Sequence, residues 1–178
     1  MAAHAAGIKV FATGGIGGVH RQPAHDISAD LPQLACTPLV VVCAGAKAIL
    51  DLPATLEYLE THAVPVVGYQ TNEFPAFYSA RSRLPTSHRA DEPQQVIELA
   101  RTHWGLGLES ALLVTAPPPP EVAMPEDEMR QAVKEALKEA IVEKHIIELE
   151  ENVLLVFPGS QANLRQIIFA DSQVPLNL

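Results

Sequence analysis

Short apolar runs rich in β-branched residues recur along the chain, separated by loops and amphipathic stretches. The runs at residues 8–13, 39–42, 64–69 and 108–115 are typical of strands, and those at 39–42 and 64–69 are expected to be buried on both faces. Helical periodicity at residues 54–62, 93–104 and 126–144 alternates with them, and residues 2–7 resemble the end of a helix closed by glycine. A strand–loop–helix repeat predicts right-handed crossovers and therefore an α/β fold with a mostly parallel sheet covered by helices.

The composition and net charge exclude several classes of protein. The chain has 178 residues, 48% of them apolar and 19% charged, which suits one domain with a real core. The net charge of -9 and the pI near 5.2 argue against a nucleic-acid polymer or an anionic membrane as partner. No apolar run is long enough to span a membrane, and the first residues lack the features of a signal peptide. We therefore expect a location in the cytoplasm or in the interior of an organelle.

The two cysteines, Cys36 and Cys43, flank the apolar run at residues 39–42. Both have apolar neighbours, so buried reduced thiols are the expectation. Their spacing does not match a zinc site.

Lys47 stands out because it follows a buried strand at residues 39–42 after a turn of small residues. Residues 48–50 are predicted to begin a helix. In parallel α/β sheets, ligands bind at the carboxyl ends of the strands. An amine that is partly dehydrated there, close to a helix N-terminus, is able to act as a nucleophile. The alternative is a surface lysine just past a strand, and the local sequence taken alone favours that alternative.

A glycine-rich loop covers residues 13–21, with the order Thr-Gly-Gly-Ile-Gly-Gly-Val-His-Arg. Its glycines allow backbone amides to approach an anion closely. The loop is not a dinucleotide fingerprint, because His20 stands where a third glycine belongs, and no Gly-Lys-Ser/Thr follows to make a P-loop. A structural turn explains the glycines about as well as a binding loop does.

Asp26, Ser28 and Asp30 precede a stretch that is expected to be helical toward Leu34. Because Asp and Ser are preferred N-caps, Asp26 or Ser28 is expected to cap this helix. Asp26 and Asp30 are also one helical turn apart and can share a face. Two carboxylates with a hydroxyl between them suit a hard cation such as Mg²⁺ or Mn²⁺ that retains several waters. The local evidence favours the cap over the cation.

Two further segments follow the strand at residues 64–69. Residues 70–78 mix hydrogen-bonding groups with aromatics, which is typical of a pocket wall or, equally, of a helix start with packed aromatics. Residues 79–92 are polar, broken by proline and partly basic, which predicts an exposed loop or flap. Because parallel strands end at one edge of a sheet, functional groups are expected to gather after residues 13, 42 and 69.

A series of collinear blocks adds a specific resemblance. The blocks are residues 11–21, 26–31 (Asp-Ile-Ser-Ala-Asp-Leu), 42–47 (Val-Cys-Ala-Gly-Ala-Lys), 55–61, 66–69 and 73–78 (Glu-Phe-Pro-Ala-Phe-Tyr). Together they resemble the pseudouridine-5′-phosphate glycosidase family. The resemblance runs in order from residue 2 to the neighbourhood of residue 139, so it is more specific than a lone glycine motif.

The resemblance implies a three-layer α/β sandwich with a mostly parallel central sheet, incomplete at its N-terminus in this chain. It implies a glycosidase, or lyase, that reversibly cleaves the C-glycosidic bond of pseudouridine 5′-phosphate to uracil and ribose 5-phosphate. It also implies a divalent metal, typically Mn²⁺, and a homotrimer. The expected partners are therefore these small molecules and further copies of the chain.

The resemblance also assigns roles to residues. Lys47 matches the nucleophile that opens the ribose and forms an imine, and an imine is an electron sink that makes cleavage of a carbon–carbon bond feasible. Asp26 matches the metal ligand, and His20 lies near the reacting sugar. Asp30 is a candidate proton shuttle. The positions implied to bind substrate are Ser28, Ala29, Asp30, Gly17 and Gly18.

The chain also departs from the family pattern. The family's glutamate proton donor and a lysine that contacts substrate lie in a region before Ala2. The loop between Arg21 and Asp26 is shorter than in the family, and the resemblance ends near residue 140. We therefore expect a truncated glycosidase-like domain at residues 1–144 and a divergent segment at residues 145–178, with an extra strand possible at residues 153–157 and a frayed end after it. The alternative function is a catalytically impaired fragment that only binds sugar phosphate or associates with full-length subunits.

Overall fold

The computed structural model describes residues 1–21 and 26–143. Residues Met1–Arg130 form one compact unit, and a second unit begins at Gln131. The domain boundary expected at residue 144 stays a prediction. The strand expected at residues 153–157, the frayed end and the shortened loop before Asp26 lie outside the described residues.

A five-stranded sheet forms the centre of the first unit. Its strands lie in the order β1-β2-β5-β3-β4, and each described pairing between them is parallel. The strands are β1 (Val10–Ala12), β2 (Val40–Cys43), β3 (Val66–Tyr69), β4 (His88–Ala90) and β5 (Leu112–Thr115). The predicted α/β class with a mostly parallel sheet is thereby confirmed.

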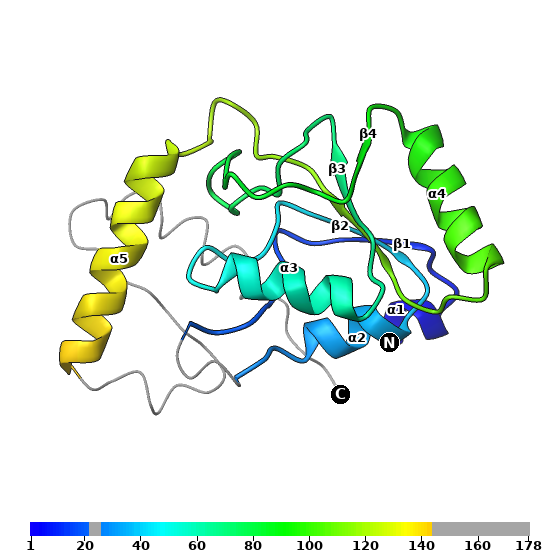
Figure 1. Ribbon diagram of the computed structural model, residues 1–178, viewed down its shortest axis with the longest axis horizontal. Helices are drawn as coiled ribbons and strands as arrows, with labels where there is room; N and C mark the ends of the chain where they lie inside the picture. Colours follow the sequence, from blue (N-terminus) through cyan, green and yellow to red (C-terminus); the bar gives the residue numbers. More distant parts are fainter. Residues whose placement is uncertain (22–25, 144–178) are drawn as a thin grey trace. The chain divides into compact units, whose positions relative to one another are not determined.

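The helices are α1 (Ala2–Ala5), α2 (Asp30–Cys36), α3 (Leu52–Thr61), α4 (Pro93–Gly105) and α5 (Glu126–Glu143). Helix α2 connects β1 to β2, α3 connects β2 to β3, and α4 connects β4 to β5. The first two connections run along the sheet in one direction, and the third runs in the opposite direction. Right-handed crossovers therefore place α2 and α3 on one face and α4 on the other, which gives three layers. In Figure 1, α2 and α3 lie together below the strands, and α4 lies apart from them at the right. Among the described residues, no helix combines the length and apolarity needed to cross a bilayer.

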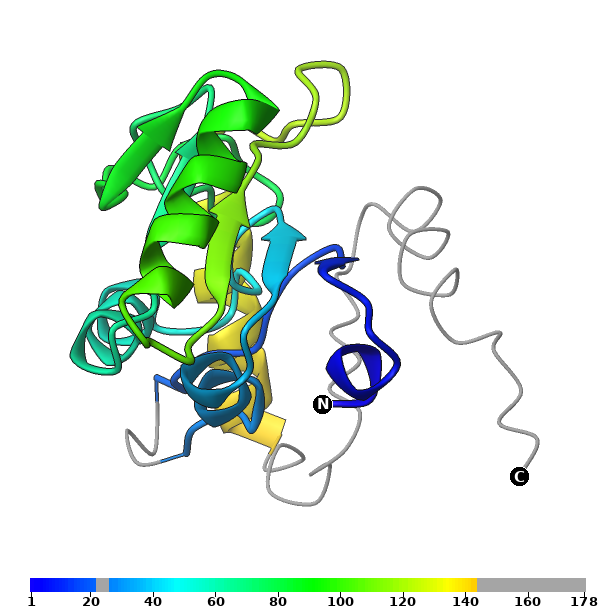
Figure 2. The ribbon, with the colours of Figure 1, turned by 90° about the vertical axis from the view of Figure 1, so that its right-hand side faces the viewer.

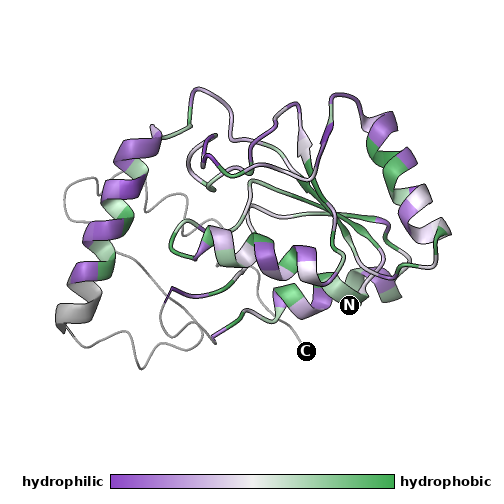
Figure 3. Ribbon diagram, in the orientation of Figure 1, coloured by the Kyte–Doolittle hydropathy of each residue, from purple (hydrophilic) through white to green (hydrophobic). Residues whose placement is uncertain are grey.

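The core under α4 explains the unbroken apolar runs of the central strands. Val96 and Ala100 of α4 pack in a buried cluster with alternate residues of four strands, namely Val40, Leu112, Val114, Val67 and Ala90. The residues between them point to the other face, and Val41 and Leu113 are buried there too. Figure 3 shows the apolar stripe of α4 and the apolar strands. Burial on both faces removes the period-two pattern that a half-exposed strand would show.

Strand β1 differs from the central strands. It lies at the edge of the sheet next to β2, as Figure 2 shows. All three of its residues are exposed in the described chain, with Val10 59% and Phe11 46% exposed. The strand itself was predicted correctly, and it lacks the two-sided burial of the central strands.

The structure changes the interpretation of two segments after β3. The exposed loop predicted at residues 79–92 was wrong in part, because residues His88–Ala90 form β4, which pairs with β3 in the register Gly68 to Arg89. Only Ala90 of β4 is buried, so this edge strand lacks the apolar run that marks the others. Of the two alternatives for residues 70–78, the helix start is excluded, because no helix forms there and Gln70 and Phe77 have φ angles of 57° and 65°, outside helical geometry.

Candidate active site

The glycine-rich loop extends past the end of β1 and runs beside the turn that follows β2. Backbone hydrogen bonds connect the two segments: Ala44 N donates to Gly14 O at 3.0 Å, and Ile16 N donates to Gly45 O at 3.0 Å. Lys47 N then donates to Ile16 O at 3.1 Å. The parallel pairing of β1 with β2 thus continues, as isolated bonds, beyond the sheet. It brings the glycine loop and Lys47 together, as expected for the carboxyl ends of adjacent strands.

Lys47 itself lies in a turn, and its side chain is exposed. Leu50 N donates to Lys47 O at 3.0 Å, which closes the turn. Helix α3 begins only after Asp51, whose Oδ1 accepts a hydrogen bond from Ala54 N at 3.0 Å. The prediction that residues 48–50 begin a helix, with Lys47 close to its N-terminus, was therefore wrong. These residues form a turn that ends at Asp51, a favoured N-cap, and the helix predicted separately at residues 54–62 is observed as α3.

The segment Ser28 to Asp30 packs against the other side of the glycine loop. Gly17 N donates to Asp30 Oδ2 at 2.7 Å, and Ser28 N donates to Gly18 O at 3.0 Å. A Cβ built on Gly17 would lie 2.1 Å from Ser28 Oγ, so only glycine allows this approach. The structure therefore brings together Gly17, Gly18, Ser28 and Asp30, with the exposed Ala29 between the last two. Their roles in binding stay predictions.

Asp26 and His20 pair across a short antiparallel contact. His20 N donates to Asp26 O at 2.9 Å, and His20 Nδ1 lies 3.8 Å from Asp26 Oδ2. The side-chain distance is too long for a hydrogen bond. It fits an ion pair if the imidazole is protonated. The predicted proximity of these two side chains to the glycine loop is thus observed, while the roles of His20 and Asp26 stay predictions.

The predicted helical relation between Asp26 and Asp30 was wrong. Helix α2 begins at Asp30, with Ala29 as its N-cap residue. Asp26 is therefore not a cap. Ser28 Oγ accepts from Asp30 N at 3.3 Å, so Ser28 contacts the first turn without occupying the cap position. The contact of Asp26 with His20 holds it in an extended segment and replaces the expected helical turn.

A divalent metal was expected at Asp26. Within residues 1–21 and 26–143, no group of three or more His, Cys, Asp or Glu side chains is placed to hold a metal ion. The Asp26 carboxylate is 56% exposed, whereas Asp30 Oδ2 already accepts a bond from Gly17 N. One open carboxylate fits Mn²⁺ or Mg²⁺ that keeps most of its waters, and it does not fit a cation enclosed by protein ligands.

Thr55 of α3 supports the glycine loop and was missed by the sequence analysis. Its side chain is fully buried. Its Oγ1 accepts from Val19 N at 3.0 Å and donates to Asp51 O at 2.7 Å. A Cβ on Gly18 would lie 2.4 Å from the same Oγ1. Helical periodicity marks apolar residues, so a buried threonine within that pattern carries no separate signal.

The segment at residues 74–78 lies against the Lys47 turn. Ala76 pairs with Gly45 in an antiparallel contact, and Phe77 N donates to Ala44 O at 3.0 Å. Phe74 is fully buried and belongs to the core, whereas Phe77 is half-buried. The pocket-wall interpretation of this segment stays a prediction.

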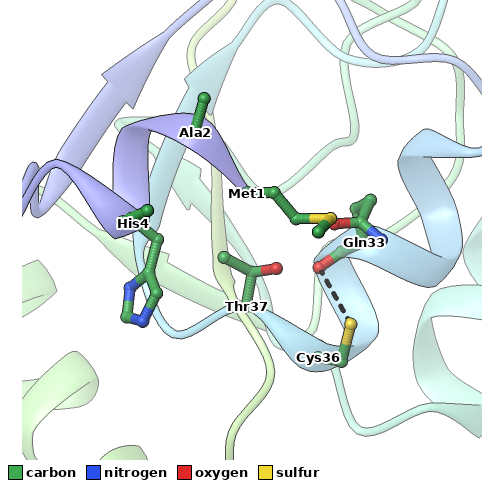
Figure 4. A pocket seen from close by; sticks show the side chains of 7 residues that line it. Met1, Ala2, His4, Gln33, Cys36 and Thr37 are labelled. Atoms are coloured by element: carbon green, nitrogen blue, oxygen red, sulfur yellow. Dashed lines mark hydrogen bonds between the residues drawn. The ribbon is translucent and has the colours of Figure 1, made fainter.

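Of the two thiols, that of Cys43 lies beside these contacts, next to backbone amides of the glycine loop and the Lys47 turn, and that of Cys36 lies away from them. Burial raises the pKa of the Cys43 thiol to about 11, so it is neutral near pH 7. Cys36 is exposed, contrary to prediction, because it lies on the outer side of α2 in its last turn. Its Sγ donates to the backbone oxygen of Gln33, as Figure 4 shows. Both residues line a hollow of about 640 Å³. Thr37 in this hollow precedes β2, so the hollow lies at the opposite end of that strand from Lys47.

Comparisons with known proteins identify the family. The family model described as indigoidine synthase A like protein matches residues 1–150. The chain therefore belongs to the indigoidine synthase A-like family. A pseudouridine-5′-phosphate glycosidase from Caldanaerobacter subterraneus subsp. tengcongensis is 52% identical over 142 residues, which are 79% of this chain and 46% of that protein. One from Gemmatimonas aurantiaca is 56% identical over 134 residues, covering 75% and 44%. The chain thus spans less than half the length of these curated relatives.

Solved structures agree with the family assignment. The prealnumycin C-glycosynthase AlnA in complex with ribulose 5-phosphate superposes with a TM-score of 0.75 at 41% identity, covering 80% of this chain and 47% of that one. An indigoidine synthase A-like protein from Thermotoga maritima gives a TM-score of 0.70 at 38% identity, covering 75% and 45%. The resemblance found in the sequence and the α/β fold are both confirmed.

Proposed function

We propose that this chain carries the lysine-bearing half of a pseudouridine-5′-phosphate glycosidase, an enzyme that reversibly cleaves a C-glycosidic bond to give uracil and ribose 5-phosphate. The observation that carries the proposal is the glycine-rich loop, whose Ile16 O binds Lys47 N while Gly17 N binds Asp30 Oδ2. This loop holds a candidate nucleophile on one side and a candidate sugar-phosphate segment on the other. The identity of half or more to curated glycosidases supports the substrate class.

In the proposed mechanism, the neutral amine of Lys47 adds to C1′ of the ribose. The bond from C1′ to the ring oxygen breaks, and that oxygen becomes a hydroxyl, which leaves an open-chain amine adduct at C1′. The bond between C1′ and the base then breaks with its electron pair going to the base, while the nitrogen lone pair of Lys47 forms the imine at C1′. A proton is delivered to the carbon of uracil that leaves, and water then releases ribose 5-phosphate from the lysine. The exposed side chain of Lys47 allows such an adduct without unfolding the turn.

The remaining candidate residues surround the same loop. Asp30, fixed by Gly17 N at 2.7 Å, is proposed to bind the sugar phosphate and to move a proton. Ser28, Ala29 and the backbone of Gly17 and Gly18 are proposed to line the sugar-phosphate position. His20 is proposed to lie beside the reacting sugar.

The further proposals concern the metal and the assembly. Asp26, with its open carboxylate, is proposed to hold a hydrated Mn²⁺, which would supply positive charge beside the phosphate or sugar oxygens. A homotrimer and a location in the cytoplasm, or in an organelle, also stay proposals. The ribulose 5-phosphate in the AlnA complex supports a sugar phosphate as ligand.

Trapping of the imine tests the function. The folded chain is incubated with ribose 5-phosphate, Mn²⁺ and sodium borohydride, and the labelled peptide is located by mass spectrometry. We expect one ribose phosphate on the peptide that contains Lys47, and no label in Lys47→Arg. The matched control, Lys9→Arg, changes a lysine outside the proposed site and should keep the label on Lys47.

Two outcomes would contradict the proposal. Label spread evenly over all lysines would indicate nonspecific chemistry, and absence of label in a sample shown to be folded by circular dichroism would exclude an imine at Lys47. Label on Lys47 without release of uracil from pseudouridine 5′-phosphate would instead support sugar-phosphate binding alone.

A further inference from the structure

Phe77 has an unusual backbone conformation at the edge of the proposed site. Its φ angle is 65°, a left-handed conformation that is uncommon for residues with a side chain and rare for bulky ones. Such strain persists only where surrounding contacts enforce it, and it often marks functional sites. The ring is half-buried, so deep burial in the core does not account for the conformation.

The contacts that enforce it come from two loops of the site. Phe77 N donates to Ala44 O at 3.0 Å, in the turn that carries Lys47. The ring occupies the space beside the glycine loop, because a Cβ built on Gly15 would lie 2.5 Å from two of its carbons. One residue therefore contacts the Lys47 turn through its amide and the glycine loop through its ring.

Neighbouring contacts keep Phe77 in this place. A Cβ on Gly45 would lie 2.0 Å from Pro75 O, so the backbone before Phe77 rests directly on the backbone of the Lys47 turn. On the other side, the Phe77 and Tyr78 rings meet edge to face at 4.5 Å. Tyr78 O in turn accepts from Met124 N at 2.7 Å. The segment is thus anchored at both ends around the strained residue.

We infer that Phe77 is a positioning residue that clamps the glycine-rich loop against the Lys47 turn. The clamp keeps the Ile16–Lys47 backbone bond in place, so that the amide of Gly17 and the amine of Lys47 serve one ligand. The identity of that ligand as a sugar phosphate rests on the proposed function. The clamp rests on the contacts of Phe77 alone.

The variant Phe77→Gly separates the clamp from general stability. Glycine adopts a φ of this sign without strain, so removal of the ring is offset by relief of the backbone. We expect little change in melting temperature. We expect amide hydrogen exchange at Ile16 and Lys47 to be faster by about tenfold or more, because exchange reports local opening. Exchange at Ala100 in α4 should not change.

Gln70→Gly is the matched control. Gln70 also has a left-handed φ, of 57°, and is exposed. Its substitution relieves similar strain without touching the glycine loop, so exchange at Ile16 and Lys47 should stay as in the unmodified chain. If Phe77→Gly speeds exchange equally at Ala100, Ile16 and Lys47, or leaves Ile16 and Lys47 unchanged, the clamp is wrong.

A second test uses complementary volumes. Gly15→Ala places a methyl group where the Phe77 ring lies, so this variant should also speed exchange at Ile16 and Lys47. In the double variant Gly15→Ala with Phe77→Gly, the methyl group enters the vacated space. Residues in contact give non-additive effects. Exchange in the double variant should therefore be no faster than in the worse single variant, and multiplied effects would overturn the contact.

Imine trapping separates this inference from the proposed function. If Lys47 is labelled by ribose 5-phosphate and borohydride, Phe77→Gly should lower the labelling rate by about tenfold or more, since small displacements of reacting groups are costly. Phe77→Tyr, which keeps the ring, should restore the rate. If Lys47 is never labelled, the proposed function fails, and the exchange measurements alone still decide whether Phe77 clamps the loop.

Discussion

Two groups of polar side chains differ in burial, because one is buried at the amino end of the sheet and the other is exposed at its carboxyl end. At the amino ends of β3 and β5, His103 and Ser110 are buried, and His103 Nε2 lies 2.7 Å from Ser110 Oγ. Ser110 Oγ donates to Ala63 O at 2.5 Å. At the carboxyl ends, Lys47 and Asp30 are exposed while the backbone around them is tightly bonded. The amino end uses its polar groups to hold the fold, and the carboxyl end leaves side-chain ends open to a ligand.

The difference shows why burial of a serine beside a histidine does not by itself make a catalytic pair. Because the Ser110 hydroxyl proton is directed to Ala63 O, its oxygen accepts from His103 Nε2, which must carry a hydrogen. The imidazole nitrogen that a nucleophilic serine would need as a base is therefore already protonated. Trp104 Nε1 also donates to Ser110 O at 3.0 Å, so the cluster is satisfied internally.

The largest effect is expected at the carboxyl end, from Gly45→Ala. Gly45 has a φ of 96°, and its new Cβ would lie 2.0 Å from Pro75 O. The left-handed conformation and the backbone clash together should cost about 3 kcal/mol or more. Thermal melts should show a decrease of about 10 °C in melting temperature. Gly105→Ala is the control, because no atom lies within 4 Å of its Cβ, and an unchanged Gly45→Ala variant would contradict the tight packing at this end.

A smaller effect is expected from Thr55→Val, which tests whether the carboxyl end also depends on buried polar groups. The substitution keeps the shape and removes the oxygen that accepts from Val19 N at 3.0 Å. A buried donor left without a partner costs about 1–3 kcal/mol. Urea unfolding should show this loss. Thr55→Ser keeps the hydroxyl, loses only a methyl group and should be destabilised less; an equal or larger loss in Thr55→Ser would contradict the prediction that the hydrogen bond is the dominant contribution of Thr55.

The smallest effect is expected at the amino end and depends on pH. Burial lowers the pKa of His103, while its bond to Ser110 acts in the opposite direction. The unfolded chain therefore binds a proton at this position more readily than the folded chain. The contribution of neutral His103 to the free energy of unfolding is complete above about pH 6.5, the pKa of histidine in the unfolded chain. It is lost as the pH falls below that value toward the lower pKa of His103 in the folded chain.

Melting temperatures from pH 8 to pH 5, measured on the unmodified chain and on His103→Asn, check this prediction. The variant should be less stable throughout, and its stability should decrease less between about pH 7 and pH 5. If the melting temperatures of the two proteins change with pH in parallel, His103 does not contribute to the pH dependence of stability, and the burial of polar groups at the amino end matters less for the fold than proposed.

Much of the architecture was predictable from local pattern. The apolar run at residues 39–42 became β2 within one residue at either end, and Pro93 begins α4 as predicted. β4 was missed because an edge strand with one buried residue has no apolar run. The helix predicted at residues 54–62 is observed as α3. The separate short helix expected at residues 48–50 is not formed, because these residues lie in a turn that ends at Asp51, the N-cap of α3, and that cap was not recognised.

The candidate site was also predictable from the sequence only in part. Lys47, the glycine loop and the aspartates were found from residue type and from position after strands, and the parallel topology explains why they meet. Their actual contacts were not predictable. Gly17 bonds to Asp30 across 13 residues, and Val19 bonds to Thr55 across 36. Periodicity and residue preference act over a few residues, so the sequence by itself determined the strands, helices and candidate chemistry. Only the tertiary structure decided which glycines leave no room for a side chain, which threonine binds the glycine loop and why Phe77 is strained. Each of these depends on atoms that are distant in the sequence and packed within van der Waals contact.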